Sequence, residues 1–267
     1  SLTATSTTSG DINLNETDAI TLTSLSNSDG AITVMAGDAI TATNVSTTGG
    51  TDTDDVSLEG TSIEVDTVSA SGLGDVILTA TSGGITDTDI NSSVTANQLN
   101  LSATGVIGGA NAINTSVDEL LSGNSSGTGD INLNETDAIT LTDLINSDGA
   151  IAVSTSGVIT AVNVSSTGGA DSDDITLAGT LIEVGTVSAS GLGDVSLEAT
   201  SGAITDTDSN SSVTADDLGL SAVGEIGGSN AINTSVTSLD ADVSGTGGIH
   251  VDDQGGVTLA SVITADG

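Results

Sequence analysis

The chain repeats itself, and this repetition limits its possible folds more than any other feature of the sequence. The 14 residues at 10–23, GDINLNETDAITLT, recur unchanged at 129–142, which sets a period of 119 residues. The same offset relates GGANAINTSV at 108–117 to GGSNAINTSV at 227–236. A repeat of this kind indicates units that stack on one another along the chain.

The period divides the 267 residues into two full repeats with a partial repeat on either side. The divisions are 1–10 as the end of a preceding repeat, 11–129 as repeat 1, 130–247 as repeat 2 and 248–267 as the start of a third repeat, which follows a one-residue deletion. We therefore expect a single elongated solenoid cut from a longer array.

Each repeat contains a shorter internal period of about 20 residues, called the beat below. Most segments of this beat open with an apolar, any, apolar triplet, such as Ile12 and Leu14 or Val56 and Leu58. Alternation of β-branched residues over short runs, interrupted by Gly, Asn, Asp and Ser, is typical of β-strands. In repeat 1 the segments begin at Asp11, Ala31, Asp55, Asp75, Asn97 and Ser116 and contain 20, 24, 20, 22, 19 and 14 residues.

A segment of about 20 residues cannot bury its own apolar face, so neighbouring segments must stack. The sequence predicts an all-β right-handed parallel β-helix of about 13 turns, because parallel crossovers are right-handed. The chain has no Phe, Tyr or Trp, which indicates a narrow core of small aliphatic side chains. Tandem β-sandwich domains are the alternative, since about 120 residues is a normal size for them. The missing aromatic residues and the short beat favour the β-helix.

The charge is entirely of one sign. The chain has 37 Asp and Glu residues, no Lys or Arg, and a formal charge of −37. Nucleic acids and anionic membranes are recognised through Lys and Arg, so neither is an expected partner. No apolar run approaches the ~20 residues of a membrane span, and we expect no membrane insertion. Divalent cations are the expected partners, because bound or diffuse cations would relieve the repulsion between carboxylates.

The repeats resemble a family of exported proteins. GDINLNETDAITLT together with VIGGANAINTSVDELLSG is similar to the repeats of filamentous-haemagglutinin-type exoproteins and large autotransporter-like bacterial adhesins. The resemblance covers essentially the whole chain. It implies a right-handed β-helix that is secreted or anchored at the bacterial cell surface and acts in adhesion, biofilm formation or contact between cells.

Two kinds of acidic cluster are candidate Ca²⁺ sites, because Ca²⁺ prefers six to eight oxygen ligands on flexible loops. The first kind is a Gly-flanked loop that is four residues longer than the usual segment, and its residues are Asp52, Asp54 and Asp55, with Asp171, Asp173 and Asp174 in repeat 2. The weaker kind is an Asp-x-Asp pair on one strand face, formed by Asp87 with Asp89 and by Asp206 with Asp208. A solvated, Asp-rich turn is the alternative for the long loops.

Catalysis is not expected. An active site needs one asymmetric cleft, whereas almost every carboxylate has a counterpart 119 residues away. His250 is the only histidine, and nothing resembles a nucleophile elbow. A polysaccharide-active β-helix enzyme is a remote alternative, because two carboxylates could serve as acid and base.

The function expected from these features is a rigid acidic stalk within a large secreted or surface-anchored bacterial protein. The alternative is a self-assembling extracellular fibre or sheath, in which copies associate end to end or laterally through open β edges.

Overall fold

The computed structural model describes residues 1–87, 89–206 and 210–265 of the chain. Every element within these ranges is a β-strand. No helix capable of crossing a bilayer occurs in this part of the chain. The internal contacts divide the molecule into two units, Ser1–Thr136 and Asp137–Gly267, which are described separately below.

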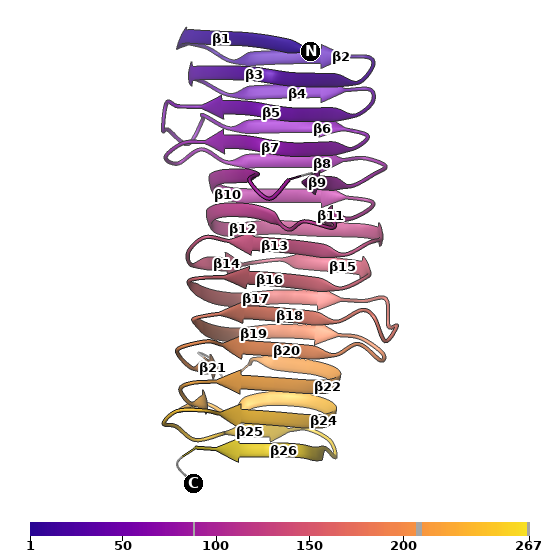
Figure 1. Ribbon diagram of the computed structural model, residues 1–267, viewed down its shortest axis with the longest axis vertical. Coiled ribbons are helices and arrows are strands. Elements are labelled where there is room, and N and C mark those ends of the chain that lie inside the picture. The colour runs from indigo at the N-terminus through magenta and orange to yellow at the C-terminus, as the bar shows by residue number, and fades with distance from the viewer. Residues whose placement is uncertain (88, 207–209, 266–267) are drawn as a thin grey trace. The chain divides into compact units, whose positions relative to one another are not determined.

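Unit 1 contains the strands β1 to β13, which Figure 1 shows stacked upon one another in indigo to magenta. Their bounds are β1 Leu2–Ser9, β2 Ile12–Glu16, β3 Ile20–Asp29, β4 Ile32–Ala36, β5 Ile40–Thr47, β6 Val56–Gly60, β7 Ile63–Ala70, β8 Val76–Ala80, β9 Ile85–Asp87, β10 Ser93–Ala103, β11 Ile107–Gly108, β12 Ile113–Thr128 and β13 Ile131–Glu135.

Unit 2 contains the strands β14 to β26, which are stacked in the same manner. Their bounds are β14 Ile139–Leu141, β15 Leu144–Asp148, β16 Ile151–Thr155, β17 Val158–Ser166, β18 Ile175–Gly179, β19 Leu181–Ala189, β20 Val195–Ala199, β21 Ile204–Asp206, β22 Ser212–Ala222, β23 Ile226–Gly227, β24 Ile232–Val243, β25 Val251–Asp253 and β26 Thr258–Thr264.

Parallel pairing between successive turns defines the fold. In unit 1, Ile32 of β4 pairs with Val56 of β6, which pairs with Val76 of β8. In unit 2, Ile175 of β18 pairs with Val195 of β20. The partners lie 20 to 24 residues apart, as the beat in the sequence predicts.

The fold is therefore a parallel β-solenoid, consistent with the expected right-handed β-helix, and the described residues make about 12 turns against about 13 expected. Tandem β-sandwich domains are excluded, because their sheets are antiparallel, whereas the strands of each unit pair in parallel with the strands of the next turn.

Ladders of aliphatic side chains form the core of each unit. One ladder of unit 1 joins fully buried side chains through the pairings between β4, β6, β8, β10 and β12, and its members are Ile32, Val56, Val76, Leu99 and Leu120. The buried apolar residues are all Leu, Ile, Val or Ala. Side chains of this size fill the narrow space between strands, which accounts for the absence of aromatic residues from the sequence.

The turns approach one another so closely that some positions require glycine. Gly72 has a φ of +68°, and a Cβ atom placed on it would lie 2.6 Å from the carbonyl oxygen of Gly50 in the preceding turn. Gly191 has a φ of +70° and meets Gly169 in the same way in unit 2. A side chain at either position would separate two stacked turns.

The two repeats differ in one β-bulge. In unit 1, Leu99 of β10 pairs with Leu120 of β12, but Asn100 pairs with Ser122, so Leu121 is an extra residue whose side chain is 38% exposed. In unit 2, the corresponding strands β22 and β24 pair without interruption. The one-residue deletion that shortens the second repeat has therefore removed the bulged residue.

Candidate cation-binding site

The long loop of unit 1, which connects β5 to β6, holds Asp54 inside the structure. The Asp54 side chain is fully buried. Its Oδ1 accepts a hydrogen bond from the N–H of Gly30 at 2.6 Å, and its Oδ2 accepts bonds from the N–H and the hydroxyl of Thr51 at 2.6 and 2.7 Å. The bond from Gly30 fastens the loop to the preceding turn, and the bonds from Thr51 close the loop on itself.

The hydrogen bonds also determine how Asp54 titrates. The N–H of Gly30 has the largest effect, followed by the hydroxyl and N–H of Thr51, and together they lower the pKa of Asp54 below its ordinary value of 3.8. Burial acts in the opposite direction but is weaker. Both oxygens of this carboxylate are occupied by donors of the protein itself.

The corresponding loop of unit 2 is less completely bonded. Asp173 is 1% exposed, and its Oδ2 accepts the N–H of Ala170 at 2.6 Å. Ala170 stands where repeat 1 has Thr51, so the hydroxyl donor is missing. The Oδ1 atom of Asp173 is buried and has no hydrogen-bond partner.

The remaining aspartates of these loops point elsewhere. Asp52 and Asp171 are exposed. Asp55 and Asp174 are half-buried just before β6 and β18, and each accepts a backbone N–H from the next turn. Within the described ranges, no group of three or more His, Cys, Asp or Glu side chains is placed to hold a metal ion. Ca²⁺ binding by these loops stays a prediction.

The Asp-x-Asp pair of unit 1 does not share one strand face, because β9 ends at Asp87. Asp87 is buried and accepts hydrogen bonds from the N–H of Asp89 at 2.8 Å and from the hydroxyl of Ser92. Asp89 is exposed and accepts the N–H of Asn91 at 2.7 Å. This pair therefore closes a turn.

In unit 2, Asp206 is buried and bonds to the hydroxyl of Ser211 in the same way as Asp87 bonds to Ser92. Its predicted partner, Asp208, lies outside the described residues.

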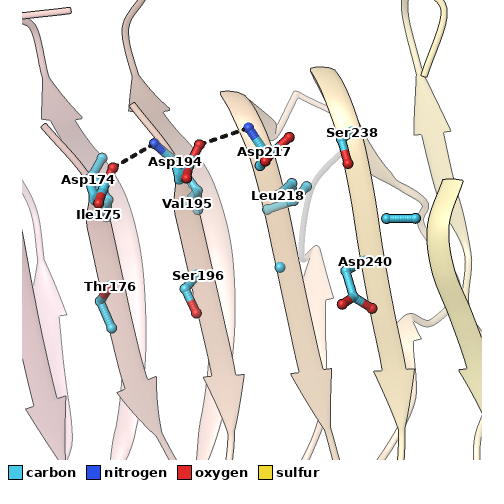
Figure 2. Close-up of a pocket in the computed structure, with 12 residues that line it drawn as sticks. Asp174, Ile175, Thr176, Asp194, Val195, Ser196, Asp217, Leu218, Ser238 and Asp240 are labelled. Carbon is cyan, nitrogen blue, oxygen red and sulfur yellow. Dashed lines mark hydrogen bonds between the residues drawn. The ribbon is translucent and has the colours of Figure 1, made fainter. Parts of the chain in front are cut away.

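A row of carboxylates runs across successive turns of unit 2, and of its members the sequence predicted only Asp174 as a site residue. We call Asp174, Asp194 and Asp217 the carboxylate ladder (Figure 2). Oδ1 of Asp174 accepts the N–H of Asp194 at 2.9 Å, and Oδ1 of Asp194 accepts the N–H of Asp217 at 3.0 Å. The carboxylates of Asp174 and Asp194 thus each join their own turn to the next one.

Unit 1 contains the same arrangement with one carboxylate fewer. Oδ1 of Asp55 accepts the N–H of Asp75 at 2.9 Å, and Oδ1 of Asp75 accepts the N–H of Gln98 at 3.0 Å. The signal for the pairs in the sequence is positional, since Asp55 and Asp75 directly precede the first buried residue of β6 and of β8, as Asp174 and Asp194 precede those of β18 and β20.

The middle carboxylate of each row is harder to ionise than an ordinary aspartate. Burial has the largest effect in raising the pKa of Asp194 above 3.8, and the negative charges of Asp174, Asp217 and Asp171 raise it further. Burial likewise raises the pKa of Asp75, with smaller effects from Asp55 and Asp52. The hydrogen bonds from Asp217 and Gln98 oppose these shifts without cancelling them.

A surface hollow of about 440 Å³ lies along the carboxylate ladder of unit 2 and is also lined by Ser196, Gly219 and Asp240. Ser196 and Gly219 stand where repeat 1 has Ile77 and Asn100. A Cβ atom on Gly219 would meet nothing closer than 4.0 Å. The hollow therefore results from the loss of side-chain volume on the outer face of the sheet.

Comparison with known proteins does not identify the chain. Neither the protein-family models nor the characterised proteins and solved structures that were searched give a significant match.

Proposed function

We propose that this chain is a structural repeat region of a large secreted or surface-anchored bacterial protein, where it serves as a rigid acidic stalk in adhesion, biofilm formation or cell contact. The observation that carries the stalk is the parallel stacking of successive turns on aliphatic ladders within each unit. In such a stack each turn contacts only the turns next to it. The number of repeats therefore sets the length of the stalk without changing the structure of each turn.

The surface chemistry supports a spacer. The carboxylates with the most hydrogen bonds, such as Asp54, fasten one turn to another. The hollow in unit 2 is lined by aspartates, small residues and aliphatic residues. The chain has no Phe, Tyr or Trp on which a sugar could stack and no Lys or Arg to hold an anionic substrate. We propose a non-catalytic role for these reasons.

Export and a role in adhesion rest on the resemblance of GDINLNETDAITLT and its partner motif to exported adhesin repeats. Labelling intact source cells with an antibody raised against residues 1–267 tests this part of the proposal. Surface labelling is expected. Signal that requires permeabilised cells would contradict it.

Electron microscopy of the purified chain separates the stalk from the fibre. Monomeric particles, elongated and of uniform width at every concentration, are expected for a stalk. Filaments that lengthen with protein concentration would favour a self-assembling fibre instead. Compact, round particles would contradict both.

A further inference from the structure

The two repeats contain the same pentapeptide, Asn-Ser-Asp-Gly-Ala, at residues 27–31 and 146–150. In both units it forms a corner between two strands, β3 and β4 in unit 1 and β15 and β16 in unit 2. Asp29 and Asp148 are exposed at the ends of β3 and β15, and each is followed by a half-buried glycine. The duplication therefore places one local sequence in two tertiary environments.

In unit 1 the N–H of the corner glycine, Gly30, is held by a carboxylate. It donates a hydrogen bond of 2.6 Å to Oδ1 of Asp54, which is fully buried. The carbonyl oxygen of Gly30 is held as well, because Nδ2 of the buried Asn27 donates to it at 2.9 Å. Both polar groups of this glycine are therefore bonded to buried side chains of the protein.

In unit 2 the carbonyl group of the corner glycine, Gly149, is also held, but its N–H is not. The carbonyl oxygen accepts the hydroxyl of Ser166 at 3.0 Å. Oδ1 of Asp173, the counterpart of Oδ1 of Asp54, has no hydrogen-bond partner, and Oδ2 accepts the N–H of Ala170. Within the described ranges the N–H of Gly149 donates no hydrogen bond. The two corner glycines therefore differ in whether their N–H groups are bonded.

The main chain can rearrange at an Asp-Gly sequence, because the glycine nitrogen can attack the side-chain carboxyl carbon of the preceding aspartate. Glycine has no side chain to obstruct this attack. The nitrogen loses its proton and forms a bond to the carboxyl carbon, while a carbon–oxygen bond of the carboxyl group breaks and the oxygen leaves as water. The product is a cyclic imide, the succinimide.

Water then opens the succinimide at one of its two carbonyl carbons. Opening at the side-chain carbon restores aspartate. Opening at the main-chain carbon breaks the original peptide bond and produces isoaspartate, in which the main chain runs through the side chain. The water that is released on ring closure is matched by the water that is consumed on opening, so isoaspartate is an isomer of aspartate and the reaction needs no other reactant.

The hydrogen bond at the glycine N–H decides which corner can react. The nitrogen becomes a nucleophile only as its proton leaves, and the Asp54 carboxylate opposes this step at Gly30, because a neighbouring anion disfavours negative charge on the nitrogen. The bond to Asp54 must also break before the attack, and hydrogen bonds to charged groups are among the stronger ones in proteins. Gly149 has no such bond to break.

We propose that Asp148 is a site of spontaneous modification, at which the main chain of unit 2 rearranges to isoaspartate, whereas Asp29 in the same local sequence is protected. The side chain of Asp148 is exposed, so water can reach it to open the succinimide. The proposal concerns the covalent structure of the chain and does not depend on a role in adhesion.

The rearrangement matters to unit 2 because the corner packs closely against the next turn. A Cβ atom placed on Gly168, in the following turn, would lie 3.1 Å from Cα of Asp148. Isoaspartate adds one carbon atom to the main chain between Cα of Asp148 and Gly149, so the corner can no longer fit against Gly168 in the same way. We expect isoaspartate at this position to lower the Tm of aged protein.

The decisive experiment ages the full chain at neutral pH in water enriched in heavy oxygen and compares the two corners within one molecule. Cleavage after glutamate, in ordinary water, then releases residues 17–59, which contain Asp29, and residues 136–183, which contain Asp148. Each passage through the succinimide incorporates heavy oxygen, and fragmentation in the mass spectrometer locates it and distinguishes isoaspartate from aspartate. The same incubation in urea is the control, because the identical local sequences should react at equal rates once the chain is unfolded.

In the folded chain we expect Asp148 to accumulate isoaspartate and heavy oxygen at least about tenfold faster than Asp29, the factor that corresponds to one hydrogen bond to a charged group. Asp54→Ala should raise the rate at Asp29 and leave that at Asp148 unchanged, with Asp52→Ala in the same loop as its control and circular dichroism as the check on folding. Equal rates at Asp148 and Asp29 in folded wild type would overturn the proposal, and so would an unreactive Asp148 over a period in which the urea control reacts.

Discussion

At the scale of single residues, the buried carboxylates determine how firmly the long loops are held. Asp54 accepts three hydrogen bonds, whereas its counterpart Asp173 accepts one from Ala170 and leaves a buried oxygen unpaired. One substitution between the repeats, Thr51 to Ala170, accounts for one of the missing bonds. The two loops have nearly the same sequence but should differ in stability.

Replacing Asp54 with Ala should lower the free energy of unfolding by about 1–3 kcal/mol, because the donors on Gly30 and Thr51 lose the buried carboxylate that accepts their hydrogen bonds. Urea unfolding near neutral pH measures the loss. The control is Asp52→Ala in the same loop, where the exposed side chain should contribute less than about 0.5 kcal/mol. Equal effects at both positions would contradict the structural role of Asp54.

Replacing Ala170 with Thr should stabilise unit 2 by about 0.5–1.5 kcal/mol, because the new hydroxyl can donate to Asp173 as Thr51 does to Asp54. The position is exposed and has room for the side chain. Ala170→Val has nearly the same shape without the hydroxyl and serves as the control. An equal gain from Val would show that the hydroxyl contributes nothing.

At the scale of strands, pairing with two neighbours fixes the register of each segment. A one-residue shift turns every inward side chain outward, so an insertion is tolerated only where a bulge absorbs it. Leu121 in β12 is such an insertion, and β24 lacks it. The outer face, by contrast, accepts changes in volume, as the hollow beside Ser196 and Gly219 demonstrates.

Deleting Leu121 should leave a cooperatively folded protein whose free energy of unfolding changes by less than about 1 kcal/mol, because β12 then matches the uninterrupted pairing of β24. The control deletes Asp240 from β24, which would turn Ala241 and Val243 outward and Asp242 inward. That deletion should cost more than about 2 kcal/mol. Denaturant unfolding followed by circular dichroism distinguishes the two results, and equal losses would exclude a tolerated bulge.

At the scale of the whole molecule, the absence of any Lys or Arg makes every unscreened charge interaction between side chains repulsive at neutral pH. Hydrogen bonds hold some of the carboxylates in rows across the turns, as in the carboxylate ladder of unit 2. We therefore expect the stability of the fold to depend on cations from the solution, whether they bind at defined positions or remain diffuse.

Raising NaCl from about 10 mM to about 1 M should raise Tm continuously, because the screening length falls from about 30 Å to about 3 Å. Ca²⁺ at equal ionic strength distinguishes a defined site from general screening. Saturable heat in calorimetry at low salt would support the predicted Ca²⁺ loops, and Asp52→Asn and Asp171→Asn should then weaken it. A Tm that does not respond to salt would contradict the dependence on cations.

The sequence by itself determined the solenoid. The 119-residue period, the beat of about 20 residues and the alternation of residues such as Val56 and Leu58 are sufficient, because a short alternating segment can bury its apolar face only by stacking on similar segments. The inward positions and the narrow aliphatic core follow from the same pattern. The absence of Lys and Arg likewise predicts that stability depends on charge screening.

The tertiary structure alone decided what each carboxylate does. The sequence predicts one cluster of Asp52, Asp54 and Asp55, because these residues are close in sequence. In the structure they lie in three different environments, because N–H groups of other turns donate hydrogen bonds to Asp54 and Asp55. Burial and, to a smaller extent, the carboxylates of neighbouring turns raise the pKa of Asp75 and Asp194, and neither effect is visible in the sequence. Periodicity specifies which residues face inward, whereas hydrogen bonding and charge depend on which atoms the next turn presents.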